Sequence, residues 1–219
     1  MLKNAIKMNL EDLWPFLAVE GGFFLLYEII EAIVLFTVKP DTSGAICGLI
    51  VLAVGIMMNL FVGGCYPVLN MDMLLRYSVT RKTALFATLG TMTLNMAVSM
   101  AFAALLGWVD SFIARAWVSA LPWVMEVESV EPPLWAYFVA GLGVVCLGFG
   151  AGAVLQKFGR KAFWILWCAW MLLIVGFNIV DWHVLDTLNI PMMAVAAAAA
   201  CLVSLLGGSA LLLRTSVKN

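Results

Sequence analysis

Six long apolar segments, separated by short polar stretches, run along the chain. A helix needs about 20 mostly apolar residues to cross a hydrocarbon layer of roughly 30 Å. The segments have this length and lack the two-residue alternation of barrel strands, so they predict helices. The predicted spans are Phe16–Val38, Gly44–Leu69, Ala84–Trp108, Leu134–Leu155, Ala162–Val180 and Pro191–Leu213. The pattern therefore predicts an all-α integral membrane protein, with residues 1–219 forming a single transmembrane domain of six helices.

The composition favours lipid as the solvent of this fold. Hydrophobic residues make up 64% of the chain, charged residues 11%, and the mean hydropathy is +1.05. Soluble domains average about 25% charged residues, and at this size they still need a polar exterior. The basic residues form no extended patch, so we expect no nucleic-acid partner.

The charges are distributed unequally between alternate loops. If the N-terminus is cytosolic, only Lys39 and Arg115 of the 12 basic residues fall in outer loops, and the acidic residues lean the other way. This distribution follows the positive-inside rule, which places both termini in the cytosol of a plasma membrane. Residues 1–14 are expected to form an interfacial helix, and residues 109–133 an extracellular loop. That loop is long enough for one surface helix over Ser111–Met125, ended by Pro132-Pro133.

The first predicted span carries three acidic residues on one face. At 100° per residue, Glu31 lies about 20° and Glu28 about 80° from Glu20. An ionisable group inside a span costs about 2.5–3.5 kcal/mol and usually faces a bundle interior or an aqueous cavity. A functional stripe would bind cationic groups or carry protons. In the alternative interpretation, Glu20 and Glu31 reach the two interfaces and only Glu28 is deep. Asn59 and Asn95 complete the candidate substrate path, although hydrogen bonding between helices would also explain them.

Signatures of an enzyme are missing from the sequence. There is no GxxxxGK[ST] loop for ATP, and the glycines of the fourth span lack the GxGxxG pattern. The Gly148/Gly152 pair instead has the spacing that lets two helices approach closely. His183 is the only histidine, and a metal site usually needs more nitrogen or sulfur ligands. We therefore expect no catalytic residue, no metal site and no cofactor in this chain.

The segment between the second and third spans has a distinct pattern. Residues 70–88 read NMDMLLRYSVTRKTALFAT, which predicts a short amphipathic helix over residues 70–82 with a basic pair, Arg81-Lys82, at its end. An interfacial helix with anchoring charges would by itself explain this pattern.

The same segment resembles the small membrane (permease) subunits of bacterial type-2 ABC transporters. In that family a [GA]-[VIMF]-[ST]-R-[KR] signature follows the second span. Here it reads Ser78-Val79-Thr80-Arg81-Lys82, and only Ser78 departs from it. The resemblance implies that residues 70–82 are a coupling helix that docks on a separate cytosolic ABC ATPase subunit. The residues implied in this contact are Arg76, Tyr77, Ser78, Val79, Thr80, Arg81 and Lys82.

The resemblance also implies a mechanism. Two copies, or this chain and a related permease, would enclose a path through the bilayer, while ATP and Mg²⁺ would bind the ATPase partner. Family members commonly export peptides, and the acidic stripe would suit a cationic amphipathic or antimicrobial peptide. Two alternatives stay open: the membrane-embedded substrate-binding subunit of a vitamin-uptake system, and a membrane scaffold that transports nothing.

Overall fold

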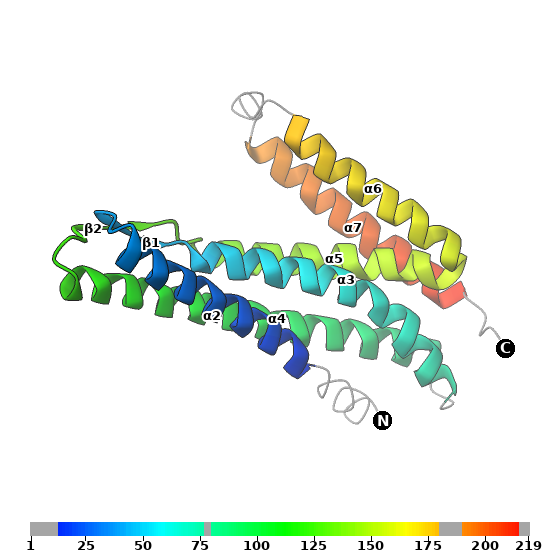
Figure 1. The fold of residues 1–219 in the computed structure, drawn as a ribbon. Coiled ribbons are helices and arrows are strands. Elements are labelled where there is room, and N and C mark those ends of the chain that lie inside the picture. Colours follow the sequence, from blue (N-terminus) through cyan, green and yellow to red (C-terminus); the bar gives the residue numbers. More distant parts are fainter. Residues whose placement is uncertain (1–12, 77–79, 180–189, 215–219) are drawn as a thin grey trace. The chain divides into compact units, whose positions relative to one another are not determined.

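A computed structural model describes residues 13–76, 80–179 and 190–214 of the chain. Across these residues the protein is mostly helical, with six helices and two short strands (Figure 1). In chain order the elements are α2 (Leu13–Thr37), β1 (Thr42–Ala45), α3 (Cys47–Arg76), α4 (Arg81–Ala120), β2 (Glu126–Ser129), α5 (Leu134–Phe158), α6 (Arg160–Ile179) and α7 (Ile190–Arg214). The predicted interfacial helix, apart from its last two residues, lies outside the described residues, as do Tyr77–Val79 and His183.

Each predicted span coincides with one of these helices. Four of them contain a stretch long and apolar enough to cross a membrane: Cys47–Leu75 in α3, Arg81–Ala120, Leu134–Phe158, and Ala194–Arg214 in α7. These four helices indicate a multi-pass membrane location. The helical nature of the six segments is confirmed, whereas six crossings remain a prediction.

The chain divides into two compact units, and three helices contribute to both. Unit 1 contains residues up to Asn59 together with Thr93–Leu142, and unit 2 contains Leu60–Met92 and the chain from Gly143 onward. The first part of α3, the second part of α4 and the start of α5 thus belong to unit 1, which also holds α2 and both strands. The candidate site lies entirely in this unit.

The helix ends follow from local sequence. After α2, Lys39 takes a positive φ of 55° and Pro40 prevents the helix from continuing. Thr80 precedes α4 as its N-cap: its carbonyl accepts from the Ala84 N–H at 2.9 Å, and its Oγ1 lies 2.8 Å from that of Thr83. Gly159, at φ 64°, ends α5 and allows α6 to begin immediately.

Two loop predictions are wrong because helices continue through them. Residues 109–120 extend α4, so this part of the predicted extracellular loop is helical and no separate helix begins at Ser111. At 1.5 Å per residue, the 40 residues of α4 extend about 60 Å, roughly twice the hydrocarbon thickness. Residues 70–76 likewise complete α3 and do not start a separate coupling helix. Alanines favour helix in residues 109–120, leucines and methionines favour it in residues 70–76, and neither stretch contains glycine or proline.

The all-α prediction also missed a small parallel sheet in unit 1. β1 pairs with β2, with Thr42 opposite Glu126 and Ala45 opposite Ser129. Strands of four residues carry too little alternation to be read from sequence. Beside them a small core of Leu35, Leu121 and Val124 joins the end of α2 to the chain that follows α4.

Unit 2 is held by very close helix contacts along α5. A Cβ on Gly152 would lie 2.6 Å from the Pro67 side chain of α3, and the Gly150 backbone faces Ser204 of α7. The Ser204 hydroxyl donates to the Cys146 carbonyl at 2.7 Å. The predicted contact role is therefore confirmed for Gly152, because only a residue without Cβ allows this approach.

Gly152→Ala should destabilise the protein by about 1–3 kcal/mol, since the new methyl group overpacks the contact with α3. Gly143→Ala is the matched control on the same helix, because nothing lies within 4 Å of its Cβ position. Thermal unfolding in detergent measures both. Equal midpoints for the two variants would contradict the close-contact assignment.

Candidate functional site

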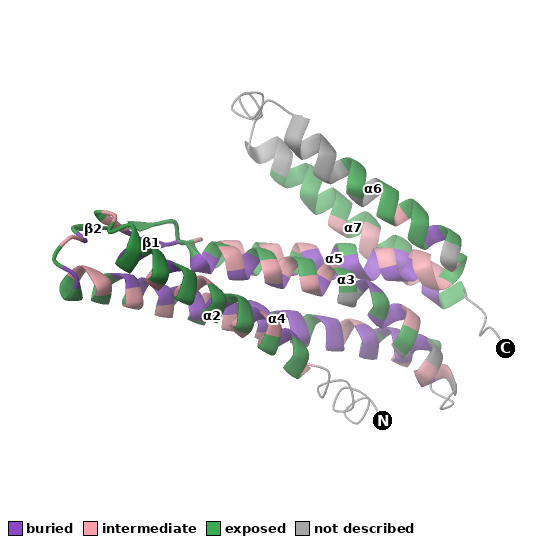
Figure 2. Ribbon diagram, in the orientation of Figure 1, coloured by how far each residue is buried: buried purple, intermediate pink, exposed green. Residues whose placement is uncertain are grey.

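In unit 1, polar side chains of α2 meet polar side chains of α4. Glu20 contacts Ser99, and about three turns further along both helices Glu31 lies near Asp110. The two helices therefore run in the same direction through this unit. Much of α2 is exposed (Figure 2), and its exposed side chains include many large apolar ones, whereas Glu20 and Glu31 lie on its buried face.

The mid-helix cluster consists of Glu20, Ser99 and Asn59, one residue each from α2, α4 and α3. The Ser99 hydroxyl donates to Glu20 Oε1, and Asn59 Nδ2 donates to Ser99 Oγ at 2.9 Å and to the Gly55 carbonyl at 2.8 Å. Glu20 is fully buried and its Oε2 has no hydrogen-bond partner. The Ser99 hydroxyl thus connects the three helices, because it bonds to both Glu20 and Asn59.

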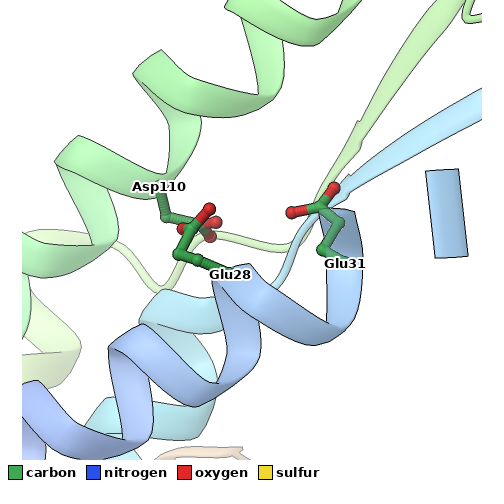
Figure 3. A group of neighbouring side chains, drawn as sticks. All are labelled: Glu28, Glu31 and Asp110. Atoms are coloured by element: carbon green, nitrogen blue, oxygen red, sulfur yellow. The ribbon is translucent and has the colours of Figure 1, made fainter. Parts of the chain in front are cut away.

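The carboxylate trio consists of Glu28, Glu31 and Asp110. One oxygen from each side chain lies within 4.8 Å of the other two (Figure 3). Asp110 is 0% exposed and Glu31 9% exposed, whereas Glu28 is half-buried. At this separation two ionised carboxylates repel by roughly 3 kcal/mol for an effective dielectric constant of 20. The arrangement therefore needs a compensating positive charge or proton.

Asp110 is held in place by the start of α3. Its Oδ2 accepts from the backbone N–H of Cys47, the first residue of α3, at 2.9 Å. The N-terminus of a helix has unsatisfied N–H groups and a positive partial charge, both of which favour a carboxylate. Asp110 thus serves as an N-cap contributed by another helix.

Glu31 is held by the strand that precedes α3. Its Oε1 accepts from Ser43 Oγ at 2.7 Å and from the Gly44 N–H at 3.0 Å. Tyr27 donates its hydroxyl to the Gly44 carbonyl at 2.6 Å, which fixes the same strand against α2. β1 therefore orients the trio from one side, and α3 orients it from the other.

One oxygen of each trio member receives no donor: Glu28 Oε1, Glu31 Oε2 and Asp110 Oδ1. Among the described residues, no lysine or arginine forms an ion pair with these carboxylates. A buried carboxylate without such compensation is costly. The trio can thus attract a cation or share protons between its members.

The structure divides the predicted acidic stripe into two clusters. Glu20 and Asn59 belong to the mid-helix cluster, and Asn95 is buried one turn before Ser99 on α4. Glu28 and Glu31 belong to the trio, with the buried Phe24 on the same helix between them and Glu20. Glu20 and Glu31 are buried between helices and Glu28 is half-buried. The alternative in which only Glu28 lies deep in the bilayer stays a prediction.

Asp110 is the site residue that sequence reasoning missed. The predicted loop over residues 109–133 included Asp110, but this residue lies within α4 and is fully buried. The signal was available in the spacing, since Ser99 and Asp110 are about three turns apart on one helical face. Ending the span at Trp108 concealed that relation.

The residues implied in ATPase coupling are described only in part. Arg81 and Lys82 are exposed in the first turn of α4, and Arg81 donates to the Leu213 carbonyl at the end of α7 at 3.1 Å. Thr80 is the N-cap. The side chains of Arg76, Tyr77, Ser78 and Val79 lie outside the described residues.

Comparisons with protein-family models, curated proteins and solved structures gave no match to this chain. The function is therefore argued from the residues and their geometry.

Ser99→Ala should destabilise the protein by about 1–3 kcal/mol, because it leaves buried Glu20 Oε1 without its donor. Ser119→Ala, on the same helix, removes only an exposed bond to the Ala116 carbonyl and should change stability little. Thermal unfolding in detergent compares them. A Ser99 variant as stable as the Ser119 variant would mean that the bond contributes nothing.

Proposed function

We propose that this chain is the membrane-spanning permease subunit of an ATP-driven ABC exporter, with six crossings and both termini in the cytosol. The observation that carries the proposal is the buried carboxylate of Glu20, held between helices whose outer faces are apolar. Ionisable groups inside membrane helices commonly mark a substrate or ion pathway. If Glu20 had only a structural role, an apolar side chain at this position would give a bundle of equal or greater stability.

The substrate that this site suits is a peptide with cationic groups. Glu20 Oε2 is unpartnered, and Asn59 supplies an amide close by. A lysine or arginine side chain would give Glu20 the charge-assisted bond that it lacks. The export of a cationic amphipathic peptide follows from this chemistry together with the resemblance of the Thr80-Arg81-Lys82 segment.

The connection between α3 and α4 is the proposed docking point for the ATPase. Basic residues are unfavourable in the first turn of a helix, because the N-terminus already carries positive partial charge. Arg81 has a partner in the Leu213 carbonyl, whereas Lys82 is exposed. Lys82 is therefore suited to an acidic partner surface. ATP and Mg²⁺ would bind that partner, and a second copy or a related permease would complete the path.

The proposed topology predicts which side of the membrane each loop faces. In a cysteine-free background, Lys39→Cys should react with an impermeant maleimide in intact cells, and Lys161→Cys only after lysis. The physical reason is the excess of basic residues on the cytosolic side. Labelling of both positions in intact cells would contradict the orientation.

Lys82→Glu should abolish co-purification of an ATPase with the tagged full-length chain from native membranes, because it reverses the charge of the docking point. Arg81→Glu should weaken it too, but it also removes a contact with α7. Lys161→Glu is the matched control, an exposed basic residue in the first turn of α6.

ATPase activity in the purified fraction is the measurement, with chain abundance determined in parallel. The proposal predicts activity with the native chain and the Lys161 variant, and none with the Lys82 variant. Absence of ATPase from every sample would overturn the permease assignment.

A further inference from the structure

The carboxylate trio at the sheet-bearing end of unit 1 contains oxygens that no group in the described structure satisfies. Asp110 and Glu31 are at least nine-tenths buried, yet Asp110 Oδ1 and Glu31 Oε2 have no donor. Figure 3 shows both carboxyl groups directed toward the space that they share with Glu28. These unpartnered oxygens are a separate observation from the clustering itself, and they indicate a missing electropositive partner.

The surroundings hold the trio in position without neutralising it. The first turn of α3 supplies about half a positive charge to Asp110, and Ser43 with Gly44 supplies two neutral donors to Glu31. Tyr27 directs its hydroxyl to a carbonyl and not to a carboxylate. Among the described residues no cationic side chain neutralises the three acidic groups, and hydrogen bonds already order the site.

The spacing of the oxygens matches one bound metal ion. Oxygens on opposite sides of Ca²⁺ lie about 4.6–5.2 Å apart, given bonds of about 2.3–2.6 Å. Mg²⁺ demands near-ideal octahedral geometry and is usually held by one or two carboxylates, so three protein carboxylates favour Ca²⁺. The three oxygens, within 4.8 Å of one another, can contact one Ca²⁺ with little movement.

We propose that Glu28, Glu31 and Asp110 bind one divalent cation of the oxygen-preferring class, with Ca²⁺ as the best match. The trio contains only carboxylate oxygens, which disfavours metals that prefer nitrogen or sulfur. Because its ligands come from α2 and α4, and Asp110 also caps α3, the ion cross-links three helices at one end of unit 1. This site does not depend on the proposed transport function.

Purified full-length protein in detergent, stripped of metal with a chelator, should bind one Ca²⁺ per chain in a calorimetric titration. Binding should also raise the midpoint of thermal unfolding, and Mg²⁺ should bind more weakly. Glu28→Gln should lower the affinity at least tenfold, because it removes a ligand charge whose Oε1 receives no donor. Glu126→Gln, an exposed acid on β2, is the control that should bind as the native chain does.

Two results would overturn the proposal. One is the absence of saturable binding of Ca²⁺ up to about 10 mM, an order of magnitude above the weakest natural Ca²⁺ modules; the acids would then share protons. The other is binding that Glu28→Gln leaves undiminished. If that variant does not fold, Glu28→Asp keeps the charge, moves it by one methylene group, and should still weaken binding. No ATPase takes part, so failure here is distinguishable from failure of the permease proposal.

Discussion

The cap that Asp110 places on the first turn of α3 is the contact on which the rest of unit 1 depends. It joins residues that are 63 positions apart in sequence, and it satisfies the Cys47 N–H, which has no partner within α3. Loss of the cap would leave a buried backbone donor without its hydrogen-bond partner, which is costly. β1 directly precedes α3, so the start of α3 also positions β1 beside Glu31. The pairing of β1 with β2 then places the small sheet at the same end of unit 1.

The two acidic clusters of α2 have different physical character. Glu20 lies among a hydroxyl and an amide, which can orient it without adding charge. Glu28 and Glu31 lie beside a third acid, Asp110, so their environment favours a bound cation or a shared proton. A single acidic stripe on a helix can therefore serve two purposes, and the neighbouring helices decide which residue serves which.

The Thr80-Arg81-Lys82 segment has a structural role beside its proposed functional one. Thr80 is the N-cap of α4, and Arg81 satisfies a carbonyl at the end of α7, a position where helix carbonyls have no internal partner. These two contacts are sufficient reason for a threonine and an arginine at this helix start. Lys82 has no such explanation among the described contacts, and it is the residue on which a docking role depends most directly.

The sequence by itself determined the positions of the six helices, because apolar runs of this length leave lipid-compatible helices as the favourable choice. It also indicated that Glu20, Glu28 and Glu31 share a face. Only the tertiary structure decided that Asp110 joins them, that α4 continues to Ala120, and that two four-residue strands pair. Helical periodicity is local and can be read along the chain, whereas a carboxylate that caps another helix and a strand pair more than 80 residues apart are set by packing alone.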